Sequence, residues 1–155
     1  MKIKLIYIGK NKSNNIEILV NNYQKKINHF LNFTISCLKN KNRSIKKEII
    51  KESDTKLIIE SLSKDEIIVL LDEKGKDIST LEFSNFIQNQ ILNGGKKLTF
   101  VIGGAYGFTK EINKYAKHKI SLSKLTFSHD MARLFFVEQL YRSLTLINNI
   151  PYHNN

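Results

Sequence analysis

The chain has 155 residues, of which 41% are hydrophobic and 25% are charged, and its formal net charge at neutral pH is +11. This size and composition are typical of one soluble globular domain, spanning residues 1–155, and no apolar run approaches the roughly 18 residues of a membrane span. The single cysteine excludes an internal disulfide framework, and the apolar N-terminal segment is too short for a signal peptide. We therefore expect a cytoplasmic protein with no membrane segment, and the sparse Cys and His residues predict no metal site.

The positive charge is concentrated in the first part of the chain. Residues 1–64 hold 14 Lys and Arg against 5 Asp and Glu, whereas residues 65–155 hold 11 against 9. This asymmetry favours a surface that contacts RNA or DNA. The alternative is a compositional bias without function, because 22 of the 25 basic residues are lysine and the chain is also rich in Asn and Ile.

The first half of the chain alternates between extended and helical patterns. Lys2–Ile8 alternates and then fills with β-branched residues, which is typical of a strand that becomes buried. Residues 16–31 and 45–62 carry apolar residues at the spacing of one helical face, and residues 32–38 are extended. Residues 39–44 are polar and basic without periodicity, a pattern that fits a phosphate-contacting loop and a solvated connection equally well.

The second half continues the same alternation. Residues 66–71 form a continuous apolar run, as in strands that are covered on both faces of a parallel sheet. Helices are expected at 79–92, at about 109–116 and at about 129–147, with strands at 97–102 and about 119–122, and Ser79 or Thr80 is expected to cap the first of these helices. The order predicts one doubly wound α/β domain with a mostly parallel sheet and helices on both faces.

Three predicted strand ends carry distinctive residues: Leu71-Asp72, Gly103-Gly104 and Leu122-Ser123. In doubly wound folds the ligand binds at the carboxyl ends of the strands, so their convergence predicts a binding site. Gly103, Gly104 and Gly107 allow positive φ angles and a close approach of backbone to ligand, although a plain turn would need only one of them. The spacing matches neither a dinucleotide-binding nor a triphosphate-binding loop, and its place after a strand argues against a KH loop.

The last predicted helix is apolar nearly all round, which fits a homodimer interface as well as a monomer core. Within it, Glu138 and Arg142 lie four residues apart and are expected to form an ion pair. His129, at its start, is either a capping residue or a substrate contact. Beyond the helix, Tyr152 and His153 follow the chain's only proline. Tyrosine can stack on a base, and histidine can exchange a proton near neutral pH.

Three motifs carry a resemblance to a known family: IGGAYG at 102–107, LSKLTFSH at 122–129 and VEQLYRSLTLINNIPYH at 137–153. Over its whole length the chain resembles the RlmH family of SPOUT-class methyltransferases. The resemblance implies an S-adenosylmethionine-dependent enzyme that methylates N3 of a pseudouridine in 23S ribosomal RNA. It also implies a homodimer and a SPOUT-like fold with a C-terminal trefoil knot at about 98–155. We expect the substrate to be the assembled ribosome.

The motifs also imply which residues form the site. The cofactor would be bound by one strand end, the glycine pair and the run that follows the last strand: Leu71, Gly103, Gly104, Leu122, Ser123, Lys124, Leu125, Thr126 and Phe127. The leucines can line an apolar slot for adenine while neighbouring backbone groups hydrogen-bond to it. His129 and Arg133 are expected to bind the substrate.

Methylation of an imide nitrogen requires loss of its proton, because only the anion is a good nucleophile. We hypothesise that His153 is the general base, that Tyr152 positions the target base, and that Arg142 stabilises the developing anion or holds a phosphate. One alternative is a non-catalytic basic RNA-binding module, which would have no need of S-adenosylmethionine. Another is a nucleotide-binding α/β protein that acts on a small molecule.

Overall fold

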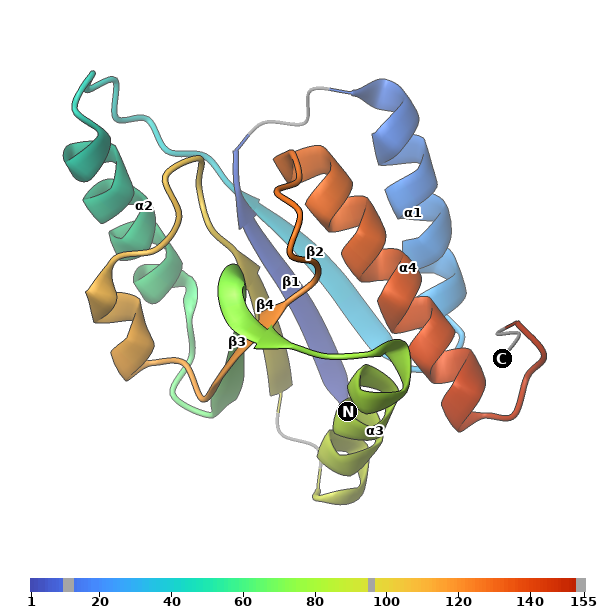
Figure 1. The fold of residues 1–155 in the computed structure, drawn as a ribbon. Helices are drawn as coiled ribbons and strands as arrows, with labels where there is room; N and C mark the ends of the chain where they lie inside the picture. The colour runs from blue at the N-terminus through green and yellow to red at the C-terminus, as the bar shows by residue number, and fades with distance from the viewer. Residues whose placement is uncertain (10–12, 95–96, 153–155) are drawn as a thin grey trace.

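The computed structural model describes residues 1–9, 13–94 and 97–152 of the chain, and Figure 1 shows their arrangement. The elements follow in the order β1 (Lys2–Ile8), α1 (Asn14–Asn28), β2 (Asn32–Leu38), α2 (Lys47–Ser61), β3 (Glu66–Asp77), α3 (Thr80–Leu92), β4 (Lys97–Ile102), the 3-10 helix η1 (Lys110–Lys114), β5 (His118–Ser121) and α4 (His129–Ile147). The predicted order of strands and helices is thereby confirmed.

The five strands form one parallel sheet in the order β2-β1-β4-β3-β5. The three central strands are covered on both faces, which explains their nearly continuous apolar sequences. In their common register Leu5 of β1 lies beside Phe100 of β4, and Phe100 lies beside Val69 of β3; all three side chains are fully buried. The structure therefore confirms an α/β architecture with a parallel sheet.

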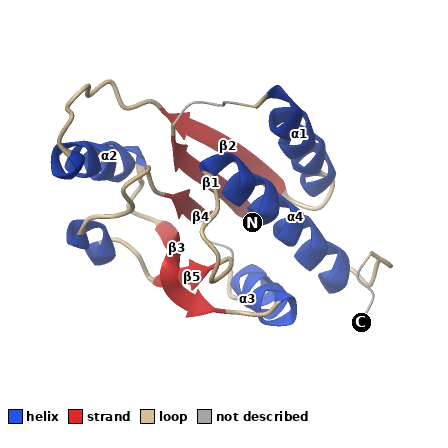
Figure 2. Ribbon diagram, turned by 45° about the horizontal axis from the view of Figure 1, so that its top comes forward, coloured by secondary structure: helices blue, strands red, loops and turns tan. Residues whose placement is uncertain are grey.

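Helices cover both faces of the sheet (Figure 2). On one face α1, α3 and α4 enclose the larger core, in which the rings of Phe100 and Phe136 are 4.7 Å apart. On the other face α2 and η1 enclose a smaller core around Ile58 and Ile112. The helix α4 packs against both α1 and α3 (Figure 1), so its apolar circumference is largely explained by burial. No described helix is both long and apolar enough to span a bilayer.

The predicted helix starts are supported by side-chain caps. Ser79 accepts a hydrogen bond from the Glu82 amide, and Glu82 accepts one from the Ser79 amide, which completes a capping box on α3. Ser128 caps α4 by accepting from the Met131 amide, so His129 is the first helical residue and not the cap.

The structure differs from the predicted elements mainly in β3, which continues to Asp77 and does not end near residue 71. Ile120 of β5 pairs with Leu71 and again with Lys76, because the intervening residues bulge around it. Gly75 lies directly against the backbone of β5: a Cβ there would be 2.6 Å from the Ile120 carbonyl carbon. This close contact between two segments that are distant in sequence could not be predicted from the periodicity of the sequence. The predicted helix near 109–116 is a short 3-10 helix.

Candidate functional site

A cleft of about 710 Å³ opens at the carboxyl ends of β3, β4 and β5, where the sequence predicted a site. It is lined by most of the predicted cofactor residues together with His129: Leu71, Gly103, Gly104, Leu122, Ser123, Leu125, Thr126, Phe127 and His129. Lys124, Arg133, Arg142 and Tyr152 do not line it, and His153 lies outside the described residues. The sheet order explains the convergence, because β4, β3 and β5 are neighbours.

The wall formed by the end of β4 is bare backbone. A Cβ at Gly103 would lie 3.1 Å from the Phe108 ring, and a Cβ at Gly104 would lie 2.0 Å from Asp54 Oδ2. The turn closes when the Gly107 amide donates to the Gly104 carbonyl at 2.9 Å, and Gly107 has a φ of 71°, which favours glycine. Each glycine therefore has a specific steric or conformational reason, which a simple strand-to-helix turn would not require.

The opposite wall is the loop between β5 and α4. Hydrogen bonds within the loop fix its shape: Ser121 Oγ donates to the Ser123 carbonyl at 2.8 Å, and the Leu125 amide donates to Ser123 Oγ at 2.9 Å. The Leu125 side chain is 72% exposed, so an apolar group is presented to solvent beside the cleft. Lys124 is directed elsewhere and pairs with Asp77 at 3.4 Å.

A buried carboxylate, which the sequence analysis did not single out, lies behind the glycine turn. Asp54 of α2 is 3% exposed, and its Oδ1 accepts a hydrogen bond from Asn40 Nδ2 at 2.7 Å. Burial raises the pKa of Asp54, while the Asn40 amide and the charge of His129 act in the opposite direction. The sequence does contain a signal for this residue: Asp54 lies four residues after Ile50 and four before Ile58, on the face of α2 that packs inward.

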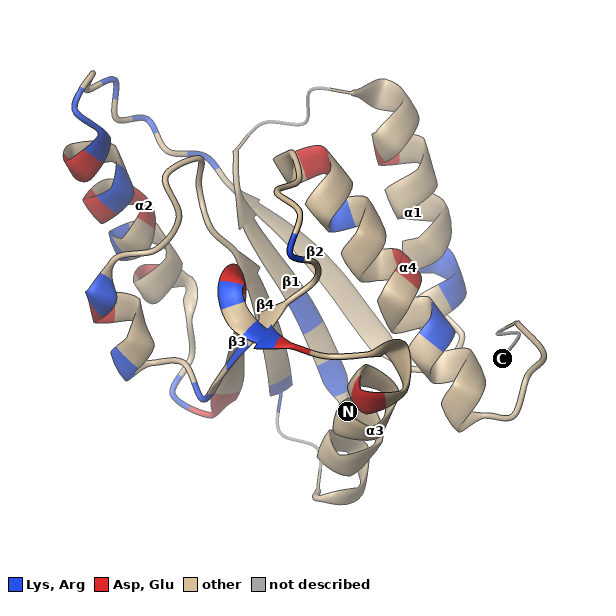
Figure 3. Ribbon diagram, viewed as in Figure 1, with Lys and Arg blue, Asp and Glu red and all other residues tan. Residues whose placement is uncertain are grey.

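Lysines surround the mouth of the cleft. Lys51, Lys74, Lys110 and Lys119 line it, and the ammonium of Lys47 lies 5.8 Å from the centre of the Tyr106 ring. Lys119 pairs with Asp72 at 3.4 Å, whereas the other three lining lysines have no acidic partner within ion-pair distance among the described residues. Figure 3 shows that Lys and Arg also follow the segment that leads into α2. The positive charge of this rim favours the anionic groups of a ligand.

Two of the three residues predicted to be catalytic, Arg142 and Tyr152, lie toward the other end of α4, and the third, His153, is outside the described residues. Arg142 Nε donates to Glu138 Oε1 at 3.0 Å, which confirms the predicted pair, and the guanidinium lies 4.9 Å from the centre of the Tyr152 ring. The Tyr152 hydroxyl is within hydrogen-bond distance of the Tyr23 hydroxyl, at 3.2 Å. Burial first, and then this hydrogen bond, raise the pKa of Tyr152, so the phenol stays protonated at neutral pH.

The cleft and this tail cluster are far apart within one chain. An α-helix rises about 1.5 Å per residue, so His129 at the cleft and Arg142 at the tail are separated by roughly 20 Å along α4. Figure 1 shows the two ends of α4 on different sides of the molecule. The structure thus brings the predicted cofactor residues together but does not bring Arg142 and Tyr152 to them.

Arg133 is completely buried, in contrast to what is usual for a substrate-contacting arginine. Its guanidinium donates to Glu17 and Asp130, both at 2.9 Å, and lies 4.5 Å from the centre of the Tyr7 ring. These partners tie the start of α4 to α1 and β1. The predicted contact of Arg133 with substrate stays a prediction.

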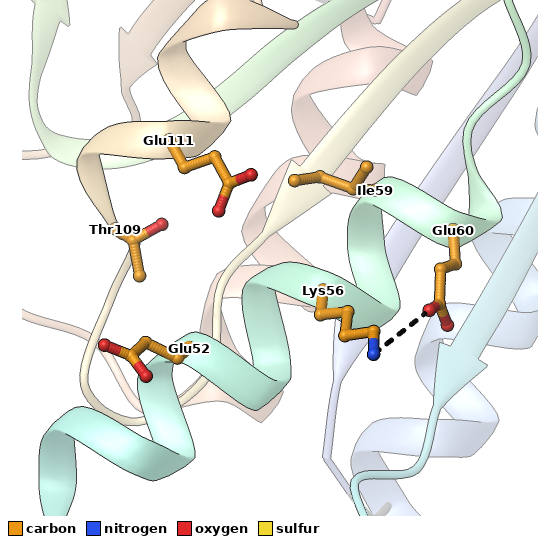
Figure 4. A pocket seen from close by; sticks show the side chains of 6 residues that line it. All are labelled: Glu52, Lys56, Ile59, Glu60, Thr109 and Glu111. Atoms are coloured by element: carbon orange, nitrogen blue, oxygen red, sulfur yellow. Dashed lines mark ion pairs between the residues drawn. The ribbon is translucent and has the colours of Figure 1, made fainter.

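A second cleft, of about 700 Å³, lies between α2 and η1 (Figure 4). Its polar lining is mainly acidic: Glu52, Glu60 and Glu111 line it together with Lys56, which pairs with Glu60 at 3.9 Å. It contains none of the predicted site residues, and its acidic lining disfavours a polyanion. No group of His, Cys, Asp and Glu in the described part of the chain is arranged to hold a metal ion.

Comparison with known proteins gives a consistent result over the whole chain. The family described as "Predicted SPOUT methyltransferase" matches residues 1–153. The chain is 43% identical to a protein of Christiangramia forsetii, 41% to one of Parabacteroides distasonis and 43% to one of Flavobacterium johnsoniae. Each comparison covers 99% of both chains, and each of these relatives is named "Ribosomal RNA large subunit methyltransferase H".

Proposed function

Because this chain belongs to the SPOUT methyltransferase family, we propose that it transfers a methyl group from S-adenosylmethionine to large-subunit ribosomal RNA. The observation that carries the proposal is the similarity, 40–43% over 99% of the chain, to relatives named for that activity. The glycine-lined cleft at the strand ends gives the chain a site of suitable size and chemistry. The expected place of action is the cytoplasm, where ribosomes are found.

The cleft residues fit the methyl donor. Leu71, Leu122 and Leu125 offer an apolar surface for adenine, and the loop around Ser123 and Thr126 offers backbone groups for its polar edge. The bare backbone of Gly103 and Gly104 accommodates a ligand that packs directly on the chain, with Phe127 closing the cleft toward α4. Lys124 would contribute through its backbone, because its side chain pairs with Asp77. When bound, S-adenosylmethionine supplies an electrophilic methyl group attached to a sulfonium.

We propose N3 of a pseudouridine as the methyl acceptor, with the tail residues preparing it. The imide must lose its proton, and we assign this role to His153, because the Tyr152 phenol is itself protonated at neutral pH and cannot accept the proton. Tyr152 would stack on or hydrogen-bond to the target base. Arg142, whose charge is secured by Glu138, would stabilise the developing anion.

A homodimer would bring the tail to the cleft. The outward face of α4 carries Phe135 near its start and Arg142 near its end, and Phe135 is 38% exposed and 4.7 Å from the Phe127 ring. Two copies that pack antiparallel through this face would place the Arg142 of one copy near the cleft of the other. This arrangement removes the separation of roughly 20 Å that a single chain imposes.

We also infer that residues 98–155 form the trefoil knot of SPOUT proteins. Within β3, the residues between Leu71 and Lys76 bulge around Ile120 of β5, and the chain that leaves β5 continues into α4, which packs against α3. The lysine rim and His129 would contact RNA phosphates around the cleft, with the assembled ribosome supplying further recognition.

The proposal is tested by transfer of labelled methyl from S-adenosylmethionine to ribosomes from a strain that lacks this protein, with free 23S RNA in parallel. We expect label on pseudouridine N3, and on ribosomes more than on free RNA. His153→Ala should abolish single-turnover transfer while leaving donor affinity unchanged. If the protein bound S-adenosylmethionine but transferred no labelled methyl, its substrate would be another molecule. If it neither bound the donor nor transferred the label, a non-catalytic RNA-binding protein would be favoured.

A further inference from the structure

Asp54 is a buried carboxylate with no role in the proposed chemistry. It lies on α2, behind the wall of the cleft, and only 3% of its surface is exposed. Its Oδ2 is packed against Gly104 so closely that a Cβ at Gly104 would lie 2.0 Å away. A single glycine backbone therefore separates this carboxylate from the space in which a ligand would bind.

Neighbouring residues hold the carboxylate in place from one side only. Asn40 donates to Oδ1 at 2.7 Å, and Ser53 Oγ donates to Asn40 Oδ1 at 3.1 Å, which fixes the orientation of the amide. In the part of the chain that the structure describes, Oδ2 receives no hydrogen bond and Asp54 has no ion-pair partner. A charge on His129, which itself lines the cleft, acts to lower the pKa of Asp54.

Such a charge is felt across the cleft more strongly than an exposed one. Electrostatic interactions are screened less around a buried group than at the surface, and a buried carboxylate that is not ion-paired favours a positive ligand nearby. Two carboxylates line the cleft itself: Asp72 is paired with Lys119 at 3.4 Å, and Glu73 is an exposed residue that accepts a hydrogen bond from Thr126. Asp54 is thus the buried carboxylate beside the glycine turn, and it has no ion-pair partner among the described residues.

We infer that the Asp54 carboxylate selects the positively charged methyl donor over the neutral product. This inference rests on the proposed binding of S-adenosylmethionine in the cleft. The donor carries a sulfonium, whereas S-adenosylhomocysteine lacks both the methyl group and the charge on sulfur. A negative charge behind Gly104 stabilises the first and not the second, and so favours release of the product after transfer.

The test is calorimetric titration of the full-length protein with three ligands: S-adenosylmethionine, S-adenosylhomocysteine and sinefungin, which carries an amine in place of the sulfonium. Asp54→Asn preserves the shape and removes the charge. We expect it to weaken binding of the two cationic ligands relative to S-adenosylhomocysteine, on the order of fivefold to tenfold. Glu52→Gln, which removes an exposed carboxylate from the same helix, should leave the ratios unchanged.

The ratio of the affinities for cationic and neutral ligands distinguishes an effect of the Asp54 charge from a structural effect of the substitution. A purely structural role of Asp54 would weaken all three ligands by the same factor, and that result, like unchanged affinities, would overturn the inference while leaving the proposed function intact. If the wild-type protein bound none of the three ligands, both the inference and the proposed function would be wrong. Thermal unfolding establishes whether Asp54→Asn is folded. If it is not folded, Asp54→Ala, which is also neutral but smaller, can be used to measure the same ratio of affinities.

Discussion

Gly75 must lack a side chain because the backbone of β5, which is distant in sequence, occupies the space that a Cβ would need. The bulge of β3 passes over β5 there, and the backbone atoms of Lys119 and Ile120 lie within 2.8 Å of the position that a Cβ would occupy. Backbone cannot move aside as the end of a flexible side chain can. Gly75 thus marks the point where the bulge of β3 packs directly against the backbone of β5.

Gly75→Ala should destabilise the protein by about 3 kcal/mol or prevent folding, because the added methyl group overlaps with backbone atoms. The measurement is urea denaturation followed by circular dichroism. Gly94→Ala is the matched control: it has open space but a φ of 85°, and its cost should be about 1 kcal/mol. Equal stability of the two variants would contradict the steric argument.

Arg133 is expected to be a structural residue of the α4 start. Arg133→Ala would leave the carboxylates of Glu17 and Asp130 without their buried partner, and loss of one member of such a group costs about 3 kcal/mol. Arg142→Ala, which removes a partly exposed pair, should cost about 0.5 kcal/mol. Chemical denaturation of both variants checks this. A fully stable Arg133→Ala that had lost RNA affinity would support the substrate role predicted from the sequence instead.

At the scale of elements, β3 and β4 are joined at their first residues by a buried ionic cluster. Glu66 accepts hydrogen bonds from the Lys97 ammonium and, at 2.7 Å, from Thr99 Oγ1. Burial raises the pKa of Glu66, but hydrogen bonds from Lys97, Thr99 and Ser63 outweigh it, and the net shift is downward from the ordinary value of 4.5. The cluster therefore links the two central strands in a pH-dependent way.

A carboxyl with a lowered pKa in the folded state stabilises the protein above its unfolded pKa, and this contribution is lost as the pH falls through the folded value. Wild-type stability should therefore decrease below about pH 4.5. The stability difference between the wild type and Glu66→Gln should be largest near neutral pH and shrink in acid. Urea midpoints between pH 7 and pH 3 measure it, with the exposed Glu60→Gln as control. A difference that grew in acid would refute this sign.

At the scale of the whole molecule, the distribution of site residues along α4 favours assembly of two copies. The outward face of this helix leads from the Phe127–Phe135 ring pair beside the cleft to the Arg142–Tyr152 pair at the tail. In the proposed function, neither end alone holds both the cofactor residues and the tail residues. Symmetric pairing would complete two sites at once.

Phe135→Glu should prevent the proposed homodimer from forming, because it would place a charge in the centre of the proposed apolar contact. Sedimentation velocity at several concentrations measures the change. Ile45→Glu, at a side chain that is 96% exposed and remote from α4, should remain dimeric. A Phe135→Glu protein that sediments like the wild type would exclude this face as the interface.

The sequence by itself determined the local structure. Apolar periodicity defined most strands and helices to within a few residues, except for the end of β3 and the 3-10 helix η1, and the glycines and the motif at 122–129 indicated the cleft. These features can be predicted locally because the alternation of buried and exposed side chains along a strand or helix depends on residues that are close in sequence. The same reasoning even paired Glu138 with Arg142, since four residues make one helical turn.

Only the tertiary structure decided what depends on contacts between distant segments. It extended β3 past residue 71 around Ile120, placed Asp54 behind Gly104, buried Arg133 between Glu17 and Asp130, and set the tail cluster roughly 20 Å from the cleft. No periodicity in a single segment encodes such contacts, because each is made by residues that meet only after the sheet has assembled. Hydrophobic pattern fixes which face of an element is buried, and packing alone determines what that face meets.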